Sequence, residues 1–298
     1  MNDIVLACIL GLLGLILGSF AGASVWRLRL AQLLEDKAAG EPIDKKELKK
    51  LQPLQAAKTT DDRSRCLMCG HILHWYDLIP LLSWVAQGGK CRYCKRRIGW
   101  YEPLAELAMA ALFVGSFLLW DFSGTPWVDI ARLVLWLVAL VPLMILFIYD
   151  VKWFLLPNKA MFPLIGLAAV FAALGLIDAP NLGPGIGSLA GAVATLSGVY
   201  WVLHVVSKGQ WIGFGDVKLG LALALLLGDW LLAFLALFLS NVFGLIAVLP
   251  GMLRGTVGAK TRIPFGPFMI LGALAAFFAG GIILGWYEGF VLFSPYSS

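Results

Sequence analysis

Residues 4–20 read IVLACILGLLGLILGSF, an apolar run that is long enough to cross the hydrocarbon core of a bilayer as a helix. Such a run near the N-terminus can also be a secretory signal, but a signal carries its positive charges before the apolar residues. Here Asp3 precedes the run, whereas Arg27 and Arg29 follow it. We therefore predict a retained first membrane span whose N-terminus lies outside the cytosol.

The rest of the chain is equally apolar. Hydrophobic residues make up 60% of the 298 residues and charged residues only 14%, whereas an average soluble domain is about a quarter charged. Apolar runs of membrane-helix length or close to it are found at 3–26, 103–120, 127–149, 160–178, 185–206, 217–228, 230–250 and 267–286. We therefore predict an all-α polytopic membrane protein of about eight transmembrane helices, or seven if the short sixth run and the seventh form one re-entrant hairpin.

The positive charges are placed as membrane orientation requires. Fifteen of the 23 Lys and Arg lie between Arg27 and Arg97, in the one long polar stretch. The external connections of the eight-span topology carry none, and the cytosolic connections carry Lys152, Lys159, Lys208, Arg254, Lys260 and Arg262. Only Arg132 departs from the positive-inside rule. The net charge of +5 therefore reflects topology, and we expect no nucleic-acid partner because the basic stretch contains no recognisable binding module.

The polar stretch divides into two parts. Residues 31–62 are charged and contain no aromatic residue, so we predict a mobile, partly helical insertion without chemistry. Residues 63–101 are rich in Cys, Trp and Tyr and form a candidate metal module. The predicted organisation is a first transmembrane helix at 1–30, a cytosolic domain at 31–102 and a seven-helix membrane domain at 103–298.

Four of the five cysteines form two Cys-x-x-Cys pairs, Cys66 with Cys69 and Cys91 with Cys94. The spacing is typical of a structural zinc site, in which each pair directs two thiolates to one metal ion. The alternatives are two disulfides or four free thiols, and the predicted cytosolic location disfavours stable disulfides. Four thiolates fill a tetrahedral shell, so we expect structural zinc.

Two aspartates lie at the predicted cytosolic ends of membrane spans. Asp150 ends the third span, and Asp216 opens the sixth, directly after Gly213 and Gly215. Carboxylates in apolar surroundings are costly and usually functional, and two that meet can share one proton and activate water for hydrolysis. The alternative is that each caps a helix or pairs with a neighbouring lysine.

Further motifs extend along most of the chain except 31–62. They are Gly18-Ser-Phe20 followed by Arg27-Leu28, Cys66-x-x-Cys69, Trp75-Tyr-Asp-Leu-Ile-Pro-Leu-Leu-Ser-Trp84, Gly89-Lys-Cys-Arg-Tyr-Cys94, Tyr101-Glu-Pro-Leu-Ala-Glu-Leu107, Asp150 with Leu156-Pro157, Gly213-Phe-Gly-Asp216-Val-Lys218 and Pro264-Phe-Gly-Pro-Phe268. Together they resemble the type IV prepilin peptidase family of leader peptidase/N-methyltransferases. The Gly-x-Gly-Asp element is also similar to the wider class of intramembrane aspartyl proteases.

The resemblance implies an enzyme of the bacterial inner membrane that cleaves the basic leader from prepilins or pseudopilins, with Asp150 and Asp216 as the catalytic pair. It also implies N-methylation of the new terminal residue with S-adenosylmethionine, because the four-cysteine domain accompanies bifunctional members. The sequence does not locate the methyl-donor site. The segment Lys95–Pro103 is a candidate for it, and its ordinary interpretation is an interfacial anchor.

Two other functions compete with the peptidase. An ion-coupled membrane transporter would also use intramembrane carboxylates, but it would predict paired broken spans in two related halves, and no such repeat is visible. A membrane scaffold with a zinc-bound docking module would leave the Gly-x-Gly-Asp element unexplained.

Overall fold

The structure is a computed structural model that describes residues 3–54, 63–256, 258, 261 and 263–292, with the backbone alone from 287. Within these residues the chain is helical, and the only β-pairing is two isolated bridges, Arg65 with Ile72 and Lys90 with Arg97. The chain forms two compact units, Met1–Leu118 and Leu119–Ser298.

The first unit is built on two long helices. Helices α1 (Asp3–Ala38) and α4 (Tyr101–Leu118) pack closely because α1 presents glycines at four-residue intervals. A Cβ on Gly14 would lie 2.7 Å from Ala110 Cα, and a Cβ on Gly18 would lie 2.7 Å from Glu106 Cα. Between them come α2 (Lys45–Leu51), η1 (Gln52–Leu54), η3 (Trp75–Asp77) and α3 (Leu82–Ala86).

The end of α1 and helix α2 form a small core of their own. Leu30 and Leu33 of α1 are buried against Leu48 and Leu51 of α2. The described part of the segment predicted as an insertion is thus largely helical, and α1 continues without a break from the apolar span to Ala38. Residues 55–62 lie outside the described residues, and the mobility of this segment stays a prediction.

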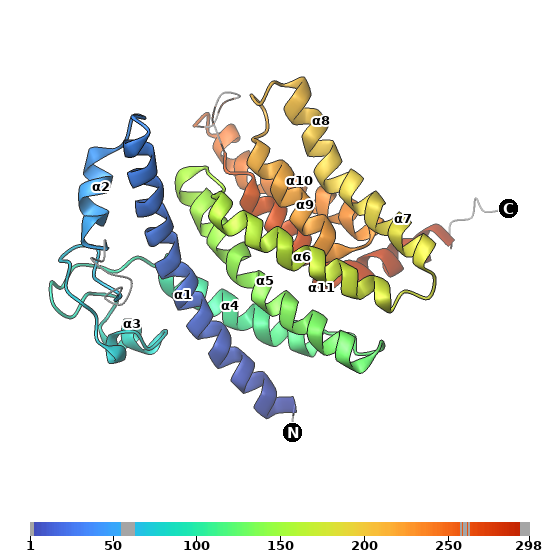
Figure 1. Ribbon diagram of the computed structural model, residues 1–298, viewed down its shortest axis with the longest axis horizontal. Helices are drawn as coiled ribbons and strands as arrows, with labels where there is room; N and C mark the ends of the chain where they lie inside the picture. The colour runs from blue at the N-terminus through green and yellow to red at the C-terminus, as the bar shows by residue number, and fades with distance from the viewer. Residues whose placement is uncertain (1–2, 55–62, 257, 259–260, 262, 293–298) are drawn as a thin grey trace. The chain divides into compact units, whose positions relative to one another are not determined.

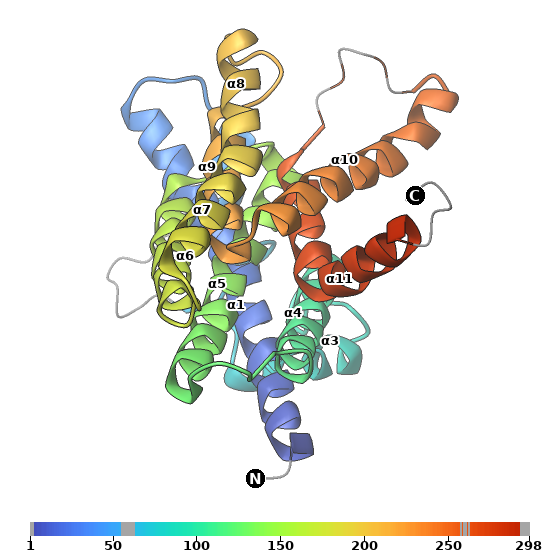
Figure 2. The ribbon, with the colours of Figure 1, turned by 90° about the vertical axis from the view of Figure 1, so that its right-hand side faces the viewer.

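The second unit holds the remaining helices. They are α5 (Pro126–Trp153), α6 (Asn158–Ile177), α7 (Leu182–Val193), the π-helix η4 (Ala194–Gly198), α8 (Val199–Val206), α9 (Phe214–Leu227), α10 (Trp230–Leu253) and α11 (Gly266–Leu292). Helix α7, the π-helix and α8 run on as one long element (Figure 1). Helices α10 and α11 pack against each other, and a Cβ on Gly272 would lie only 2.6 Å from Ala236 O. In Figure 2 the two helices splay apart toward their far ends.

Every predicted apolar run is helical, and the protein is a multi-pass membrane protein. Among the described residues, seven helices are long and apolar enough to cross a membrane. The short sixth run corresponds to α9, whose 14 residues are about 21 Å long and therefore shorter than the hydrocarbon core. Gly228 ends α9 with φ 69° and Asp229 caps α10, so the two are separate helices.

Arg132, the exception to the charge rule, has a local explanation. Its guanidinium carbon lies 4.6 Å from the ring centroid of Phe171, and its charge is attracted to Asp129 and Asp178. A cation with aromatic and acidic neighbours is tolerated inside a bundle. Arg132 therefore has a packing role within the second unit and gives no information on topology.

Candidate active site and metal centre

Asp150 lies in the last turn of α5, where the partial negative charge of the helix end disfavours a carboxylate. Its side chain is nevertheless only 5% exposed. The compensating contact comes from α11, because the N–H of Gly266 at the start of that helix donates to Asp150 Oδ2 at 3.0 Å. A buried carboxylate placed against its own helix dipole and held by a distant backbone N–H is unusual for a residue with a purely structural role.

Asp216 lies in the first turn of α9, where a carboxylate is favoured. The N–H of Gly213 donates to Asp216 Oδ2 at 3.2 Å, so the capping role considered from the sequence is real. Lys218, the candidate charge partner, instead donates to Asn158 Oδ1 at 2.8 Å and lies over the rings of Phe162 and Phe214. Within the described part of the chain, Lys218 makes no ion pair with Asp216.

Leu156 packs against two glycines, Gly215 beside Asp216 and Gly266 beside Asp150. A Cβ on Gly215 would lie 3.1 Å from Leu156 Cβ, and a Cβ on Gly266 would lie 3.4 Å from Leu156 Cδ2. The glycine before Asp216 and the glycine that holds Asp150 therefore pack on the same leucine. Neither could carry a side chain without moving the carboxylate beside it or Leu156.

Asp150 and Asp216 line one cavity of about 1420 Å³, which lies wholly within the second unit. Its volume exceeds the range of about 300–1,000 Å³ that is usual for small-molecule sites. Its wall includes Tyr200, a buried residue whose hydroxyl has no hydrogen-bond partner among the described residues. Phe265 packs against Tyr200 with ring centroids 5.7 Å apart. The cavity could take an extended peptide and a water molecule between two acidic groups.

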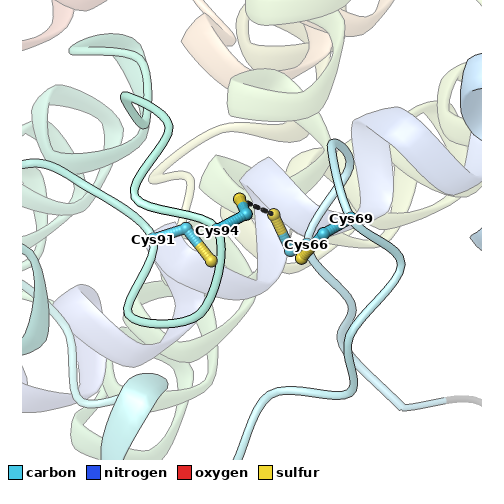
Figure 3. Close-up of side chains that lie close together, drawn as sticks. All are labelled: Cys66, Cys69, Cys91 and Cys94. Atoms are coloured by element: carbon cyan, nitrogen blue, oxygen red, sulfur yellow. Dashed lines mark hydrogen bonds between the residues drawn. The ribbon is translucent and has the colours of Figure 1, made fainter.

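The predicted cysteine pairs lie together in the first unit. The sulfurs of Cys66, Cys69, Cys91 and Cys94 all lie within 4.8 Å of one another, and those of Cys66 and Cys94 are 3.9 Å apart (Figure 3). A tetrahedral zinc ion with Zn–S bonds of about 2.3 Å needs sulfurs about 3.8 Å apart. The arrangement therefore fits a four-thiolate metal site.

The two knuckles of this site have the same backbone. In the first, Cys66 N–H donates to His71 O and Gly70 N–H donates to Cys66 O; in the second, Cys91 N–H donates to Arg96 O and Lys95 N–H donates to Cys91 O. Gly70 and Lys95 hold the same left-handed position, with φ 70° and 57°. Gly70 makes the tight turn that closes the first knuckle, and Lys95 forms the matching turn although it is not a glycine.

The thiols differ in how easily they ionise. A hydrogen bond from the backbone N–H of Arg96 lowers the pKa of Cys94 to about 7. Burial raises the pKa of Cys66 to about 12. Only thiolates bind zinc, so metal binding at this site must displace at least the Cys66 proton.

Asp77 is a structural residue that sequence reasoning did not single out. Its carboxylate accepts hydrogen bonds from Arg92 Nε at 2.9 Å, Tyr93 Oη at 3.0 Å and the backbone N–H of His74 at 3.2 Å. Arg92 and Tyr93 lie between the cysteines of the second knuckle. Asp77 therefore ties η3 to that knuckle. A single acidic residue within a Trp-Tyr-Asp motif gives no sign of these contacts.

The two halves of the chain match two family models. Residues 12–120, which contain the four cysteines, match the bacterial peptidase A24 N-terminal domain. Residues 137–249, which contain both aspartates, match the type IV leader peptidase family. These matches favour the peptidase over the transporter and the scaffold considered from the sequence.

Curated relatives cover nearly the whole chain. The prepilin leader peptidase/N-methyltransferase of Pseudomonas aeruginosa is 32% identical over 286 residues, covering 95% of this chain and 93% of that protein. The protein of the same name from Stutzerimonas stutzeri is 32% identical over 279 residues, covering 93% and 92%. Its Bacillus subtilis counterpart is 29% identical over 228 residues, covering 76% and 85%. No solved structure matches the chain.

Proposed function

The chain belongs to the type IV leader peptidase family, and on that basis we propose that it is a membrane aspartyl endopeptidase that removes the leader peptide from type IV prepilins and pseudopilins. We assign catalysis to Asp150 and Asp216. The observation that carries the assignment is that both residues line one large cavity in the second unit, although 65 residues separate them along the chain.

The geometry suits a shared-proton mechanism. Gly266 N–H and Gly213 N–H each engage one oxygen of the neighbouring carboxylate, which leaves the other oxygen to face water or substrate. Two nearby carboxylates resist joint ionisation, so the pair holds one proton. The ionised member takes a proton from the attacking water, and the protonated member donates its proton to the scissile carbonyl or the leaving amine. The proton belongs to the pair, so neither aspartate has a fixed role.

The place of the cavity in the fold suits the substrate. Its lining includes the end of α5, the beginning of α9 and the residues just before α11, and both α5 and α11 are candidate membrane spans. A prepilin with a basic leader in the cytosol and a hydrophobic mature helix exposes its scissile bond at the membrane surface. We propose that these helix ends face the cytosol of a bacterium, in its inner membrane, with the N-terminus of the chain on the periplasmic side.

We further propose that the chain N-methylates the product, since its relatives are named leader peptidase/N-methyltransferases. S-Adenosylmethionine would supply the methyl group. The metal at the four cysteines is zinc in this proposal, and it holds the cytosolic domain at 31–102 together. Along the chain, that domain follows the first transmembrane helix at 1–30 and precedes the membrane peptidase domain at 103–298.

The peptidase assignment is tested with purified protein in detergent and a synthetic prepilin, with leader loss measured by mass. We expect Asp150→Asn and Asp216→Asn each to lower the cleavage rate at least a thousandfold, because an amide cannot hold or release the shared proton. The matched control is Asp129→Asn, which alters a carboxyl that is 4% exposed and does not line the cavity. Full cleavage by either of the first two variants would rule out the mechanism.

A further inference from the structure

A second cavity, of about 350 Å³, lies within the first unit. Its volume falls in the range of about 300–1,000 Å³ that is usual for small-molecule sites. Helix α1, helix α4 and the segment between the two knuckles all line it, and the lining residues include Trp26, Arg27, Trp84, Glu102 and Glu106. It is separate from the cavity of the two aspartates, since the two have no lining residue in common.

Glu106 is the buried acidic group of this cavity. It is 8% exposed, and Gly18 of α1 packs directly on its backbone because glycine has no Cβ. Glu106 Oε2 accepts a hydrogen bond of 2.8 Å from Leu81 N–H, which engages one of its two oxygens. Leu81 has a left-handed φ of 58°, a strained conformation for leucine. The chain thus accepts backbone strain at a residue that orients a buried carboxylate.

Glu102 lies one helical turn before Glu106 on α4 and lines the same cavity. Its Oε1 accepts a hydrogen bond of 3.2 Å from Tyr101 Oη, and that hydroxyl in turn accepts one of 3.1 Å from Trp26 Nε1. The hydrogen bonds therefore connect α1 and α4 around the acidic side of the cavity. Two carboxylates at this spacing give the cavity a localised negative charge.

The other residues that line the cavity supply a positive charge and aromatic rings, in addition to the two carboxylates. Arg27 lines the cavity and supplies a positive charge next to Trp26. Trp84 supplies an aromatic surface, supported from outside by Trp100 with ring centroids 4.5 Å apart. The indole N–H of Trp84 is buried and has no hydrogen-bond acceptor among the described residues. The cavity thus combines two carboxylates, a guanidinium and tryptophan rings.

We propose that this cavity binds the methyl donor, S-adenosylmethionine, and that Glu102 and Glu106 are its main polar ligands. The donor carries a sulfonium cation and a ribose diol, which suit the carboxylates, a carboxylate of its own, which suits Arg27, and a purine, which suits a tryptophan face. The inference rests on the proposed N-methylation and adds the place where it occurs. It extends the candidate segment Lys95–Pro103, of which Ile98, Glu102 and Pro103 line the cavity.

The transfer of the methyl group from S-adenosylmethionine to the cleaved pilin needs no further reactant. An N–C bond forms between the neutral terminal amine of the cleaved pilin and the methyl carbon, and the S–C bond breaks with its electron pair left on sulfur. The sulfonium becomes a neutral thioether, and the methylated amine loses one proton to solvent. In the protein, the two glutamates stabilise the positive charge of the bound donor, which is largest before transfer.

The test is equilibrium binding of S-adenosylmethionine to the full-length protein by titration calorimetry, with no pilin present. We expect Glu106→Gln and Trp84→Ala each to raise the dissociation constant at least tenfold, since each removes a ligand group from the wall. The matched control is Glu41→Gln, which alters an exposed glutamate of the same unit and keeps wild-type affinity. Wild-type affinity in both cavity variants would overturn the proposal.

A second measurement covers the case in which a variant fails to fold. Ultraviolet cross-linking of radiolabelled S-adenosylmethionine to the wild-type protein should label peptides within 16–27 or 77–106, whereas a label confined to the second unit would overturn the proposal. A wild-type protein that neither binds the donor nor adds a methyl mass to cleaved pilin contradicts N-methylation itself. A wild-type protein that methylates pilin but is labelled elsewhere contradicts only the site.

Discussion

The glycines beside the two aspartates differ in how much room they leave for a side chain. A Cβ on Gly266 would lie 2.8 Å from Asp150 Oδ2, closer than real Cβ contacts allow, whereas a Cβ on Gly213 would come no closer than 3.5 Å to Asp216 Oδ2. Gly213 has φ −72°, which alanine adopts without strain. The Gly-x-Gly-Asp element therefore has a permissive first glycine, and the less permissive contacts are made by Gly215 and Gly266.

This difference gives a paired prediction. Gly266→Ala should lower the cleavage rate about a hundredfold, because it displaces the Asp150 carboxylate by a fraction of an ångström to about 1 Å. Gly213→Ala should keep the rate within about threefold of wild type. Leader loss measured by mass on both variants checks the pair, and equal effects would show that the Asp150–Gly266 contact does not position the catalytic group.

The hydroxyl group of Tyr200 gives a second prediction, on the rate of cleavage. Its hydroxyl has no partner among the described residues and its side chain lines the aspartate cavity, so a substrate peptide is its natural acceptor. Tyr200→Phe should lower kcat about tenfold, the value of one hydrogen bond of about 1.4 kcal/mol, and should leave the melting temperature unchanged or higher. A loss of melting temperature with unchanged kcat would assign the hydroxyl a structural role instead.

Among the helices, α9 depends on the π-helix beside it. A Cβ on Gly220 would lie 2.6 Å from Leu196 O, and Ser197 Oγ donates to Val217 O at 3.1 Å. The π-helix widens the helix at the point where α9 approaches it most closely. Asp216 lies one turn from this contact, so the irregular segment helps to hold the short helix that carries one of the two proposed catalytic carboxylates.

The two knuckles allow a matched test of backbone conformation. Gly70→Ala should destabilise the metal module by about 1 kcal/mol, because the left-handed conformation penalises a Cβ. Lys95→Ala should change stability by no more than a few tenths of a kcal/mol, because position 95 already carries a Cβ in that conformation. Thermal unfolding of the zinc-loaded protein checks both, and an equal loss in both variants would contradict the explanation.

For the whole molecule, the division into two units separates the two proposed chemistries. The cysteines and the donor cavity belong to the first unit, and both aspartates belong to the second. Removing the metal should loosen the knuckle that Asp77 holds, and with it the wall that carries Trp84.

The prediction is therefore that chelation lowers the methylation rate at least tenfold and keeps leader cleavage within about threefold of the untreated protein. Both rates can be followed by mass on the same prepilin sample, and restoring zinc should restore methylation. An equal loss of both activities would show that the metal supports the whole protein.

Much of this organisation could be predicted from the sequence. The apolar runs predicted every membrane helix, and the spacing of the cysteines predicted that their sulfurs would meet. Asp150 and Asp216 were found because carboxylates are rare at the ends of apolar runs. Their roles as catalytic residues stay a prediction, although one cavity contains both.

The remaining contacts could not be predicted because they join residues far apart in the chain. Gly266 reaches Asp150 across 116 positions, and Leu81 reaches Glu106 across 25. A lone glycine or a helical glutamate has no local pattern that indicates such a partner. The helical continuation of α1 to Ala38 could not be predicted either, because its stability comes from packing on α2 and it no longer has the continuous apolar run of a membrane span.

The likeness of the two knuckles has one more consequence. A shift of 25 positions carries Cys66 onto Cys91, Gly70 onto Lys95 and the bridge Arg65–Ile72 onto Lys90–Arg97, so the two halves of the four-cysteine site have the same backbone pattern. The stretch that connects the two knuckles holds Asp77, which binds the second knuckle, and Leu81 and Trp84, which bind or line the walls of the proposed donor cavity. The connecting stretch is therefore a segment that can be exchanged as one piece between two knuckles of the same backbone pattern. We expect that exchanging this stretch, with Asp77 kept, alters binding at the proposed donor cavity while the second knuckle keeps its contacts.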